Sequence, residues 1–402
     1  MKPDLKTAVT KLLSYCQAAN WAGYDPYDAL NSRLLTAFPF FDARLPRLVL
    51  TQALKRSPVN LRRLLLIPKT QNPKALALFL SAFVKLAEIG LTDDEGLVEL
   101  MIDRLTALRS PGLSHWCWGY SFPWQGRAVL VPAGAPNLVS TTFAANALLD
   151  AYERVHDSRC LRMAASAGQY LLDRLYWTDG GSLAGFSYPL PSVRSQTHNA
   201  NFLAAALLCR LDRITGEEQF LAPALRVARF SAQSQLADGS WYYGEGRSQR
   251  WIDNFHTGYN LCALRAIAAD AGTAEFDSCI QRGFEFYRAH FFRPDGSVRY
   301  FHNREYPVDV HCVAQSVITL LAFRDLDPEN IRLAHSVFQW AVSHMWDDRG
   351  FFYYRVHRFG INRTSYMRWS QAWMLLALSM LLAESNVAAK QPQSHVLAPL
   401  EA

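Results

Sequence analysis

A turn sequence recurs along the second half of this chain at nearly constant spacing. Asp179, Asp238, Asp295 and Asp348 each lie in a short turn close to a glycine, and they are separated by 59, 57 and 53 residues. Asp-Gly flanked by aromatic and β-branched residues is typical of a hairpin turn. A period of this length indicates that one structural unit is repeated along the chain.

Each turn is followed by a polar cluster and then by a strongly apolar segment. We expect buried helices in these segments, with an earlier copy ahead of the first turn, at residues 139–152, 201–211, 259–269, 314–323 and 371–382. A more amphipathic helix follows each of the first four after a few residues, which is typical of antiparallel helix pairs. These outer helices are expected at residues 158–176, 217–235, 274–292 and 328–346.

The number of units predicts the architecture. Buried helices begin near residues 73, 139, 197, 254, 309 and 365, and outer helices begin near 93, 158, 217, 274 and 328. A helix over about residues 5–22 supplies the sixth outer helix, so that six pairs close into a ring. The sequence therefore predicts an all-α fold, an (α/α)6 toroid with short β-hairpins in the outer-to-inner loops. An open α-solenoid is the alternative.

Composition sets the remaining boundaries. Half of the residues are apolar, which suits one large domain over residues 1–384, and residues 385–402 are small and polar and are predicted to form a flexible tail. A diffuse net charge of +6 argues against a nucleic-acid partner. No apolar run predicts a membrane span, and no secretion signal is visible. Seven cysteines without a C-x-x-C pair favour a reducing compartment, so we expect a cytoplasmic protein.

In this topology the long outer-to-inner loops emerge on one face, beside the N-termini of the buried helices. The sequence WIDNFHTGY at residues 251–259 places Asp253 and His256 there. Capping of the helix is the simpler explanation of these polar residues. The sharper hypothesis is acid–base chemistry by Asp253 and His256, together with His198 and Tyr259.

Further polar and aromatic residues of these loops are predicted to bind substrate. Flat aromatic faces stack on sugar rings, and arginines recognise carboxylate or phosphate, so an acidic sugar or oligosaccharide is the expected ligand. The residues are Asp25, Asp28, Asn31, Trp118, Tyr120, Trp124, Arg127, Asn199, Asn254, Asp309, His311, Arg368 and Trp369. In the alternative interpretation the histidines are helix caps, the repeated aspartates are turn residues, and residues 116–124 plug the core.

No metal or other cofactor is predicted. Three histidines in related positions could ligate zinc, but we expect the ring to hold them apart. The sequence contains no G-x-S-x-G, Walker A, Rossmann glycine or H-E-x-x-H pattern.

The six-hairpin pattern resembles the α/α-toroid carbohydrate-active proteins, which include unsaturated uronyl hydrolases, N-acylglucosamine 2-epimerases, heparinase-type lyases and glucuronyl C5-epimerases. The segments YDPYDALNS, PVNLRRLLLIPKTQNPKALALF and CWGYSFPWQGR are similar to uncharacterised bacterial polysaccharide-biosynthesis proteins of the VpsJ type. An acid is common in that group where this chain has Pro123, so no role of that acid carries over. Gln235 to Trp241 resembles the QW repeat of terpene cyclases, but the cyclase D-x-D-D motif is missing.

These resemblances imply a glycan-modifying enzyme of bacterial surface or exopolysaccharide biosynthesis. Hydrolysis needs two carboxylates, for which Asp253 could pair with Asp25, Asp28, Glu245 or Asp309. A lyase or epimerase would instead use His256, His198 or Tyr259, with Arg368 or Arg127 neutralising the substrate carboxylate. The alternatives are a non-catalytic glycan-binding or scaffold protein that associates with polysaccharide-synthesis proteins, and a terpene-cyclase-like toroid.

Overall fold

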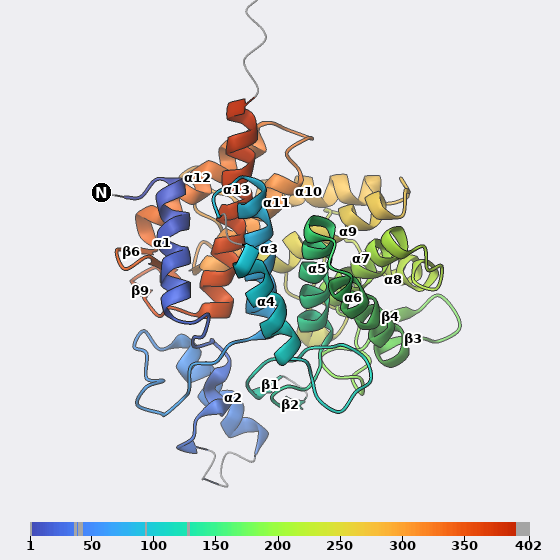
Figure 1. Ribbon diagram of the computed structural model, residues 1–402, viewed down its shortest axis with the longest axis horizontal. Coiled ribbons are helices and arrows are strands. Elements are labelled where there is room, and N and C mark those ends of the chain that lie inside the picture. Colours follow the sequence, from blue (N-terminus) through green and yellow to red (C-terminus); the bar gives the residue numbers. More distant parts are fainter. Residues whose placement is uncertain (1, 36–37, 39–42, 93–94, 127–128, 391–402) are drawn as a thin grey trace, which may run out of the picture.

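The computed structural model describes residues 2–35, 38, 43–92, 95–126 and 129–390. Six inner helices lie side by side around one axis (Figure 1). They are α3 (Pro73–Glu88), α5 (Leu138–Val155), α7 (His198–Thr215), α9 (Asn254–Asp270), α11 (Val310–Ala322) and α13 (Ala372–Lys390). Each packs against the next, and α13 packs against α3, so the ring is closed.

Six outer helices surround this ring. They are α1 (Leu5–Ala18), α4 (Glu95–Ala107), α6 (Ser158–Tyr170), α8 (Leu221–Gln233), α10 (Asp277–Phe291) and α12 (Glu329–His344). The outer helices α4, α6, α8, α10 and α12 each pair with the inner helix that precedes them in the sequence. Helix α1 pairs with α13, the last inner helix. The predicted (α/α)6 toroid is therefore confirmed, and the open solenoid is wrong.

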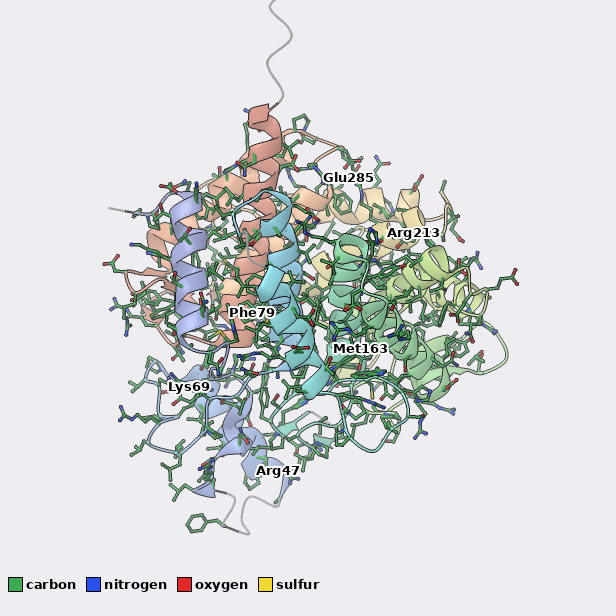
Figure 2. The ribbon with its side chains drawn as sticks, in the orientation of Figure 1. Arg47, Lys69, Phe79, Met163, Arg213 and Glu285 are labelled. Atoms are coloured by element: carbon green, nitrogen blue, oxygen red, sulfur yellow. The ribbon has the colours of Figure 1, made fainter. Side chains whose placement is uncertain are left out.

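Buried polar caps set where the inner helices begin. Asn72, Asn137, Asp253 and Asp309 each accept a hydrogen bond from a backbone N–H in the first turn of the helix that follows. Such a cap satisfies one of the four N–H groups that a helix start leaves without a partner. The turns beyond the caps are rich in buried alanine and leucine, which allows close packing, and Phe79 of α3 (Figure 2) lies 5.0 Å from the Trp21 ring.

The outer-to-inner loops carry the short strands. The two-stranded hairpins are β1 (Trp124–Gln125) with β2 (Leu130–Val131), β3 (Tyr176–Thr178) with β4 (Ala184–Phe186), and β6 (Trp346–Asp347) with β7 (Phe351–Phe352). A three-stranded sheet joins β5 (Val308–Asp309), β8 (Arg355–His357) and β9 (Gly360–Asn362) in the order β5-β8-β9. The first loop adds a helix that the sequence did not predict, α2 (Arg44–Arg56), which lies near β1 and β2 at one end of the ring (Figure 1).

The repeated aspartates are turn residues. Asp179, Asp238 and Asp295 each accept the backbone N–H two positions later, at 2.8, 3.0 and 3.0 Å. In the fourth turn this role belongs to Asp347, which accepts from Arg349 N at 3.0 Å. The prediction that Asp348 holds this turn is therefore wrong by one residue.

Glycines in three of these turns touch the next outer helix around the ring. A Cβ at Gly239 would lie 2.3 Å from the Arg282 carbonyl oxygen of α10, and one at Gly296 would lie 2.7 Å from that of Ser336 in α12. Gly350 repeats the contact with Lys11 of α1, also at 2.7 Å. The last turn of the repeat thus packs on the first helix of the chain, which closes the outer layer.

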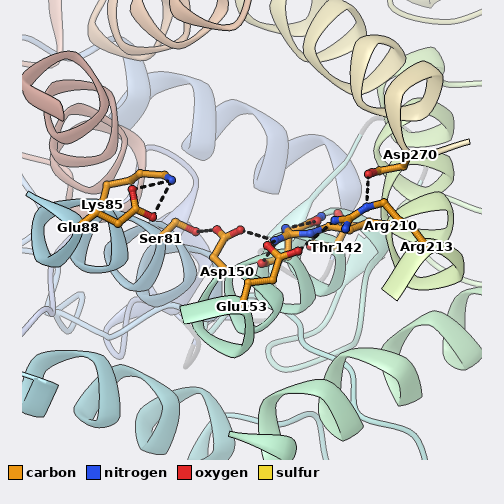
Figure 3. Close-up of polar contacts among 10 residues, drawn as sticks. Ser81, Lys85, Glu88, Thr142, Asp150, Glu153, Arg210, Arg213 and Asp270 are labelled. Atoms are coloured by element: carbon orange, nitrogen blue, oxygen red, sulfur yellow. Dashed lines mark hydrogen bonds and ion pairs between the residues drawn. The ribbon is translucent and has the colours of Figure 1, made fainter. Parts of the chain in front are cut away.

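The opposite end of the ring is tied by a network of charged side chains (Figure 3). Asp150 accepts from Ser81 at 2.6 Å and from Arg210 at 2.8 Å, and Arg210 also reaches Glu153 at 2.7 Å. Glu153 and Asp270 both bind Arg213. The network joins the C-terminal halves of α3, α5, α7 and α9 to one another, at the end of the ring that is remote from the outer-to-inner loops.

The C-terminal boundary differs from the prediction. Helix α13 continues to Lys390, past residue 384 where the domain was expected to end, and the remainder of the predicted tail lies outside the described residues. Among the described helices, none has the length and apolar character needed to cross a membrane.

The glycine turns allow a test of ring closure. Gly180 and Gly350 both have positive φ, 83° and 92°, but only Gly350 has backbone atoms of another element within 4 Å of the position that a Cβ would occupy. We expect Gly180→Ala to lower the free energy of unfolding by about 1–2 kcal/mol through backbone strain alone. Gly350→Ala should lower it further, because its methyl group would also push α1 away. Equal losses in urea unfolding would contradict the packing of this turn on α1.

Candidate active site

The inner helices all begin at one end of the ring, where the outer-to-inner loops emerge, and we call this end the mouth. In each inner helix, the residue two positions after the N-cap lies at the same height along the ring axis, so these six side chains form one layer at the mouth. These residues are Lys74, Val139, Asn199, Phe255, His311 and Arg368. Two contacts show that these side chains converge. The His311 ring lies 4.6 Å from the ring of Phe255 on the neighbouring helix α9, and the Lys74 ammonium of α3 lies 5.4 Å from the ring of Tyr259, which belongs to α9 on the other side of the ring.

Asp253 and His256 form a hydrogen-bonded pair at the start of α9. One carboxylate oxygen of Asp253 caps the helix through His256 N at 3.0 Å. The other oxygen receives His256 Nδ1 at 2.7 Å and the Trp251 indole N–H at 2.9 Å. One oxygen of Asp253 thus caps the helix, which is the simpler explanation that the sequence offered, and the other oxygen orients His256.

The imidazole of His256 is fixed in orientation by its neighbours but remains partly exposed to solvent. Its side chain is 21% exposed, whereas that of Asp253 is 1% exposed. The rings of Phe255 and Tyr243 lie 4.0 and 4.6 Å from the imidazole, so they restrict its orientation. Because Nδ1 is engaged with Asp253, Nε2 is the nitrogen left for a ligand at the mouth.

Tyr259 and His311 form a second pair, deeper in the ring. The Tyr259 hydroxyl lies 2.6 Å from His311 Nε2, and His311 Nδ1 is buried without a hydrogen-bond partner. Burial lowers the pKa of His311 well below its usual range, and the nearby Lys74 and Arg368 lower it further. Burial also raises the pKa of Tyr259 well above its usual range, so this pair is neutral around pH 7.

Lys74 is a buried amine that the sequence analysis missed. Its ammonium lies 4.1 Å from the Phe143 ring centroid and 5.2 Å from that of Trp373. Burial lowers the pKa of Lys74 well below its usual range, and the Arg368 charge lowers it further while Asp25 opposes the shift. The signal that could have found it is its register: Lys74 follows the Asn72 cap by two residues, as Arg368 follows Tyr366.

Arg368 is already paired with an aspartate. Its guanidinium makes two hydrogen bonds to Asp25, at 2.7 and 2.8 Å, and both side chains are 4% exposed. It also stacks 4.6 Å from the Tyr120 ring. Asp25 and Arg368 therefore neutralise each other in the structure, and their roles as ligands of the sugar stay predictions.

Two more aspartates of the mouth are held in the same way. Asp28 pairs with Arg62 at 2.7 Å, and burial raises the pKa of this carboxyl to about 6 against the opposing effect of Arg62. Asp309 caps α11, binds Arg355 and accepts the indole N–H of Trp369 at 2.9 Å. Asp28, Asp309 and Trp369 consequently shape the mouth instead of presenting free polar groups to it.

His198 turns towards the loop before α9. Its Nε2 lies 2.9 Å from Glu245, whose side chain is 47% exposed, and its Nδ1 is buried without a partner. Burial lowers the pKa of His198, and Glu245 opposes the shift. The three histidines stand one, three and two residues after their caps, so they point in different directions. Among the described residues, no group of three His, Cys, Asp or Glu side chains could hold a metal ion.

Two predicted ligand residues lie in the core. Trp118 is fully buried and donates its indole N–H to the Leu105 carbonyl at 2.7 Å. Asn254 is fully buried between helices, where it bonds to Ser316 at 3.1 Å and accepts from Tyr287 at 3.1 Å. Each side chain thus has its polar atoms satisfied inside the protein, and the assignment of both residues to substrate binding stays a prediction.

The remaining predicted residues stay candidates. Tyr120 and Trp124 are half-buried, with ring centroids 6.2 Å apart, and the Trp124 indole nitrogen has no hydrogen-bond partner. Asn199 is nearly buried with an unpartnered amide oxygen, and Asn31 ends a short 3₁₀ turn in the first loop. Arg127 lies outside the described residues.

The sequence matches no protein-family model and no curated protein. Solved structures do share its fold. Cellobiose 2-epimerase from Bacillus thermoamylovorans B4167 aligns with a TM-score of 0.63 at 10% identity, over 79% of this chain and 90% of that chain. A GH76 α-mannanase from Bacteroides thetaiotaomicron gives 0.62 at 12% identity, over 79% and 88%. Unsaturated glucuronyl hydrolase from Bacillus sp. GL1 gives 0.61 at 15% identity, over 92% and 94%.

This chain has the fold of the (α/α)6 toroids. The resemblance predicted from the repeated hairpins is confirmed at the level of the fold, and the closer resemblance to VpsJ-type proteins stays a prediction. At these identities the likeness shows the fold alone, so the chemistry has to be argued from the mouth itself.

The burial of Lys74 generates a stability prediction. We expect Lys74→Met to raise the free energy of unfolding at pH 7, because the folded chain buries an amine that is charged and hydrated in the unfolded chain. Between the lowered pKa of Lys74 and about 10.4, the unfolded chain binds a proton that the folded chain does not, so wild-type stability rises with pH. The advantage of the variant should therefore shrink between pH 7 and pH 10 in urea unfolding.

Lys85→Met is the matched control, since Lys85 lies on the same helix in an exposed pair with Glu88. It should show no such pH dependence. A Lys74→Met variant that is less stable than wild type by the same amount at every pH would mean that Lys74 is charged and held by the aromatic rings.

Proposed function

We propose that the protein is a carbohydrate-modifying enzyme that epimerises an acidic sugar, or eliminates a group from it, by removing a proton from carbon. His256 is the proposed proton-transfer group. The observation that carries the proposal is the Asp253–His256 pair, in which a buried carboxylate orients a partly exposed imidazole at the mouth of the toroid.

The pair assigns different roles to its two members. A carboxylate only accepts hydrogen bonds, so Asp253 fixes the proton of His256 on Nδ1 and leaves the Nε2 lone pair free to take a proton. Asp253 is too deeply buried to reach a sugar and acts as a positioning residue. This revises the expectation that Asp253 is itself the acid or base.

The carboxylates of the mouth favour removal of a proton from a sugar carbon over hydrolysis of a glycosidic bond. A glycosidase needs two carboxylates about 5–10 Å apart that flank the scissile bond. Asp25, Asp28 and Asp309 are each paired with a buried arginine. Glu245 is exposed, but it is bonded to His198. The other candidate carboxylates, all of them in the described part of the chain, are held in ion pairs and cannot serve as its free partner.

The chemistry also needs donors for the charge that develops on oxygen. When His256 takes the proton next to a sugar carboxylate, the C–H electron pair moves into the carboxyl group to form an enediolate. Burial keeps Tyr259 and Tyr120 protonated by raising their pKa values, so Tyr120 can donate to such an oxygen, and Tyr259 can do so when His311 Nε2 is the donor in the bond between them. Return of a proton to the opposite face gives the epimer, and loss of a substituent from the adjacent carbon gives an unsaturated sugar.

The preference for an acidic sugar is supported by charge near the aromatic residues of the first loop. The Lys55 amine of α2 bonds to the Tyr27 hydroxyl and stands 5.6 Å from the Trp369 ring. The structural neighbours named as an epimerase, a mannanase and a glucuronyl hydrolase support a carbohydrate substrate. Bacterial surface-polysaccharide biosynthesis in the cytoplasm, with polysaccharide-synthesis proteins as partners, is the context that we propose from the VpsJ resemblance.

The test is turnover of a panel of uronic acids and their oligosaccharides, with products followed by NMR. We expect His256→Gln to lower kcat by about 10²–10⁴. Asp253→Asn should do the same, because its amide would donate to Nδ1 and force the His256 proton onto Nε2.

His290→Gln is the control, because His290 lies in outer helix α10 and its imidazole bonds to the Phe286 carbonyl of the same helix. It should keep wild-type rates. Glycosidic cleavage that survives in folded His256→Gln would overturn the proposal in favour of hydrolysis. Binding of uronates without any turnover would favour a glycan-binding protein.

A further inference from the structure

A second cleft lies at the seam of the ring, where the loop after α1 meets the loop before α13. Its volume is 340 Å³, within the range of about 300–1,000 Å³ that is typical of small-molecule sites. Tyr15 and Tyr24 contribute aromatic side chains to its walls, and Asn60 and Ser365 contribute polar ones. The walls thus come from both ends of the chain.

The charges in this seam cleft are all of one sign. Lys69, Arg349 and Arg363 line it, and no carboxylate is among its described lining residues. Asp347 neutralises Arg349 through hydrogen bonds of 2.8 and 3.0 Å. Lys69, which is labelled in Figure 2, and Arg363 instead stand near tyrosine rings, 5.7 Å from Tyr24 and 5.4 Å from Tyr353.

A cleft at the opposite end of the ring provides a contrast. It has a similar volume, 280 Å³, and it is also lined by two cations, Lys85 and Arg154. Three acids, Glu88, Asp150 and Glu153, line it as well. The excess of positive charge therefore belongs to the seam cleft and is not a general property of hollows on this protein.

One wall separates the seam cleft from the mouth. Tyr24 and Met367 are joined by a backbone hydrogen bond of 3.2 Å, and both line the cleft. The next residues along each segment, Asp25 and Arg368, form the buried ion pair of the mouth. The seam cleft and the mouth therefore lie on two sides of the same pair of segments.

We propose that the seam cleft binds a carboxylate-bearing sugar residue and serves as a remote subsite for an acidic oligosaccharide. Lys69 and Arg363 bind the carboxylate, and Tyr24 supplies an aromatic face for the sugar ring. The inference rests on the acidic sugar substrate proposed above. It does not depend on the reaction assigned to His256, because no residue of the seam cleft belongs to the Asp253–His256 pair.

The experiment is a binding titration with fluorescently labelled hexagalacturonate. We expect Lys69→Ala/Arg363→Ala to raise Kd about tenfold or more and to reduce the dependence of Kd on salt. Both side chains are exposed, so the variant should keep the wild-type melting temperature. Lys85→Ala/Arg154→Ala removes the same charge from the opposite cleft and should leave Kd unchanged.

The remaining arms separate the possible sources of binding. Neutral maltohexaose should bind more weakly than hexagalacturonate to the wild-type protein and should not distinguish the variants. In the His256→Gln background, Lys69→Ala/Arg363→Ala should raise the Kd for hexagalacturonate as much as it does in the wild type. This result is expected even if the reaction assigned to His256 is wrong. Unchanged hexagalacturonate affinity in Lys69→Ala/Arg363→Ala, or an equal loss in the control pair, would overturn the site. Competition by inorganic sulfate as strong as that by monomeric galacturonate would overturn its assignment to a sugar.

Discussion

The buried ion pair between Asp25 and Arg368 joins the first outer-to-inner loop to the start of the last inner helix. The two residues are 343 positions apart, and their side chains are almost inaccessible. Removing one partner of such a pair leaves an unpaired buried charge, which costs about 3–5 kcal/mol. The pair therefore specifies one register for the first loop against the start of α13, and this register closes the ring.

Closure has a direct consequence for function. Once α13 lies against α3, the six inner helices begin at the same end, and their loops must converge on one mouth. Asp28 with Arg62 and Asp309 with Arg355 repeat the arrangement of Asp25 with Arg368, so three buried carboxylates are fixed by arginines from other segments. What this scaffold leaves accessible at the start of α9 is the imidazole of His256. The same wall that fixes Arg368 also forms one side of the seam cleft, which places the proposed chemistry and the proposed remote subsite on two sides of a single pair of segments.

The repeated turn sequence was sufficient to predict the toroid, because a period close to 55 residues leaves few ways to bury six apolar helices. It was not sufficient to predict which side chains face the mouth. Successive residues of a helix are rotated by about 100°, so an uncertainty of one residue in the cap decides between the axis and the core. Asn254 follows its cap by one residue and is buried between helices, whereas His256 follows the same cap by three and is accessible. Lys74 was missed for a different reason. Its cap, Asn72, belongs to a loop without an Asp-Gly turn, so the repeat did not mark the start of this helix. The pairing of Arg368 with Asp25 could not be read from either segment alone, because it depends on the closed ring.

The central claim is that His256 removes a proton from the carbon next to the carboxylate of a sugar. The most direct measurement is hydrogen exchange at that carbon, followed by NMR while the protein is incubated with a uronic acid oligosaccharide in D₂O. The account predicts that the wild-type protein removes the hydrogen from this carbon, either replacing it with deuterium or leaving an unsaturated sugar, and that His256→Gln does neither. Release of a saturated sugar by cleavage of a glycosidic bond, with the original hydrogen retained at this carbon, would contradict it.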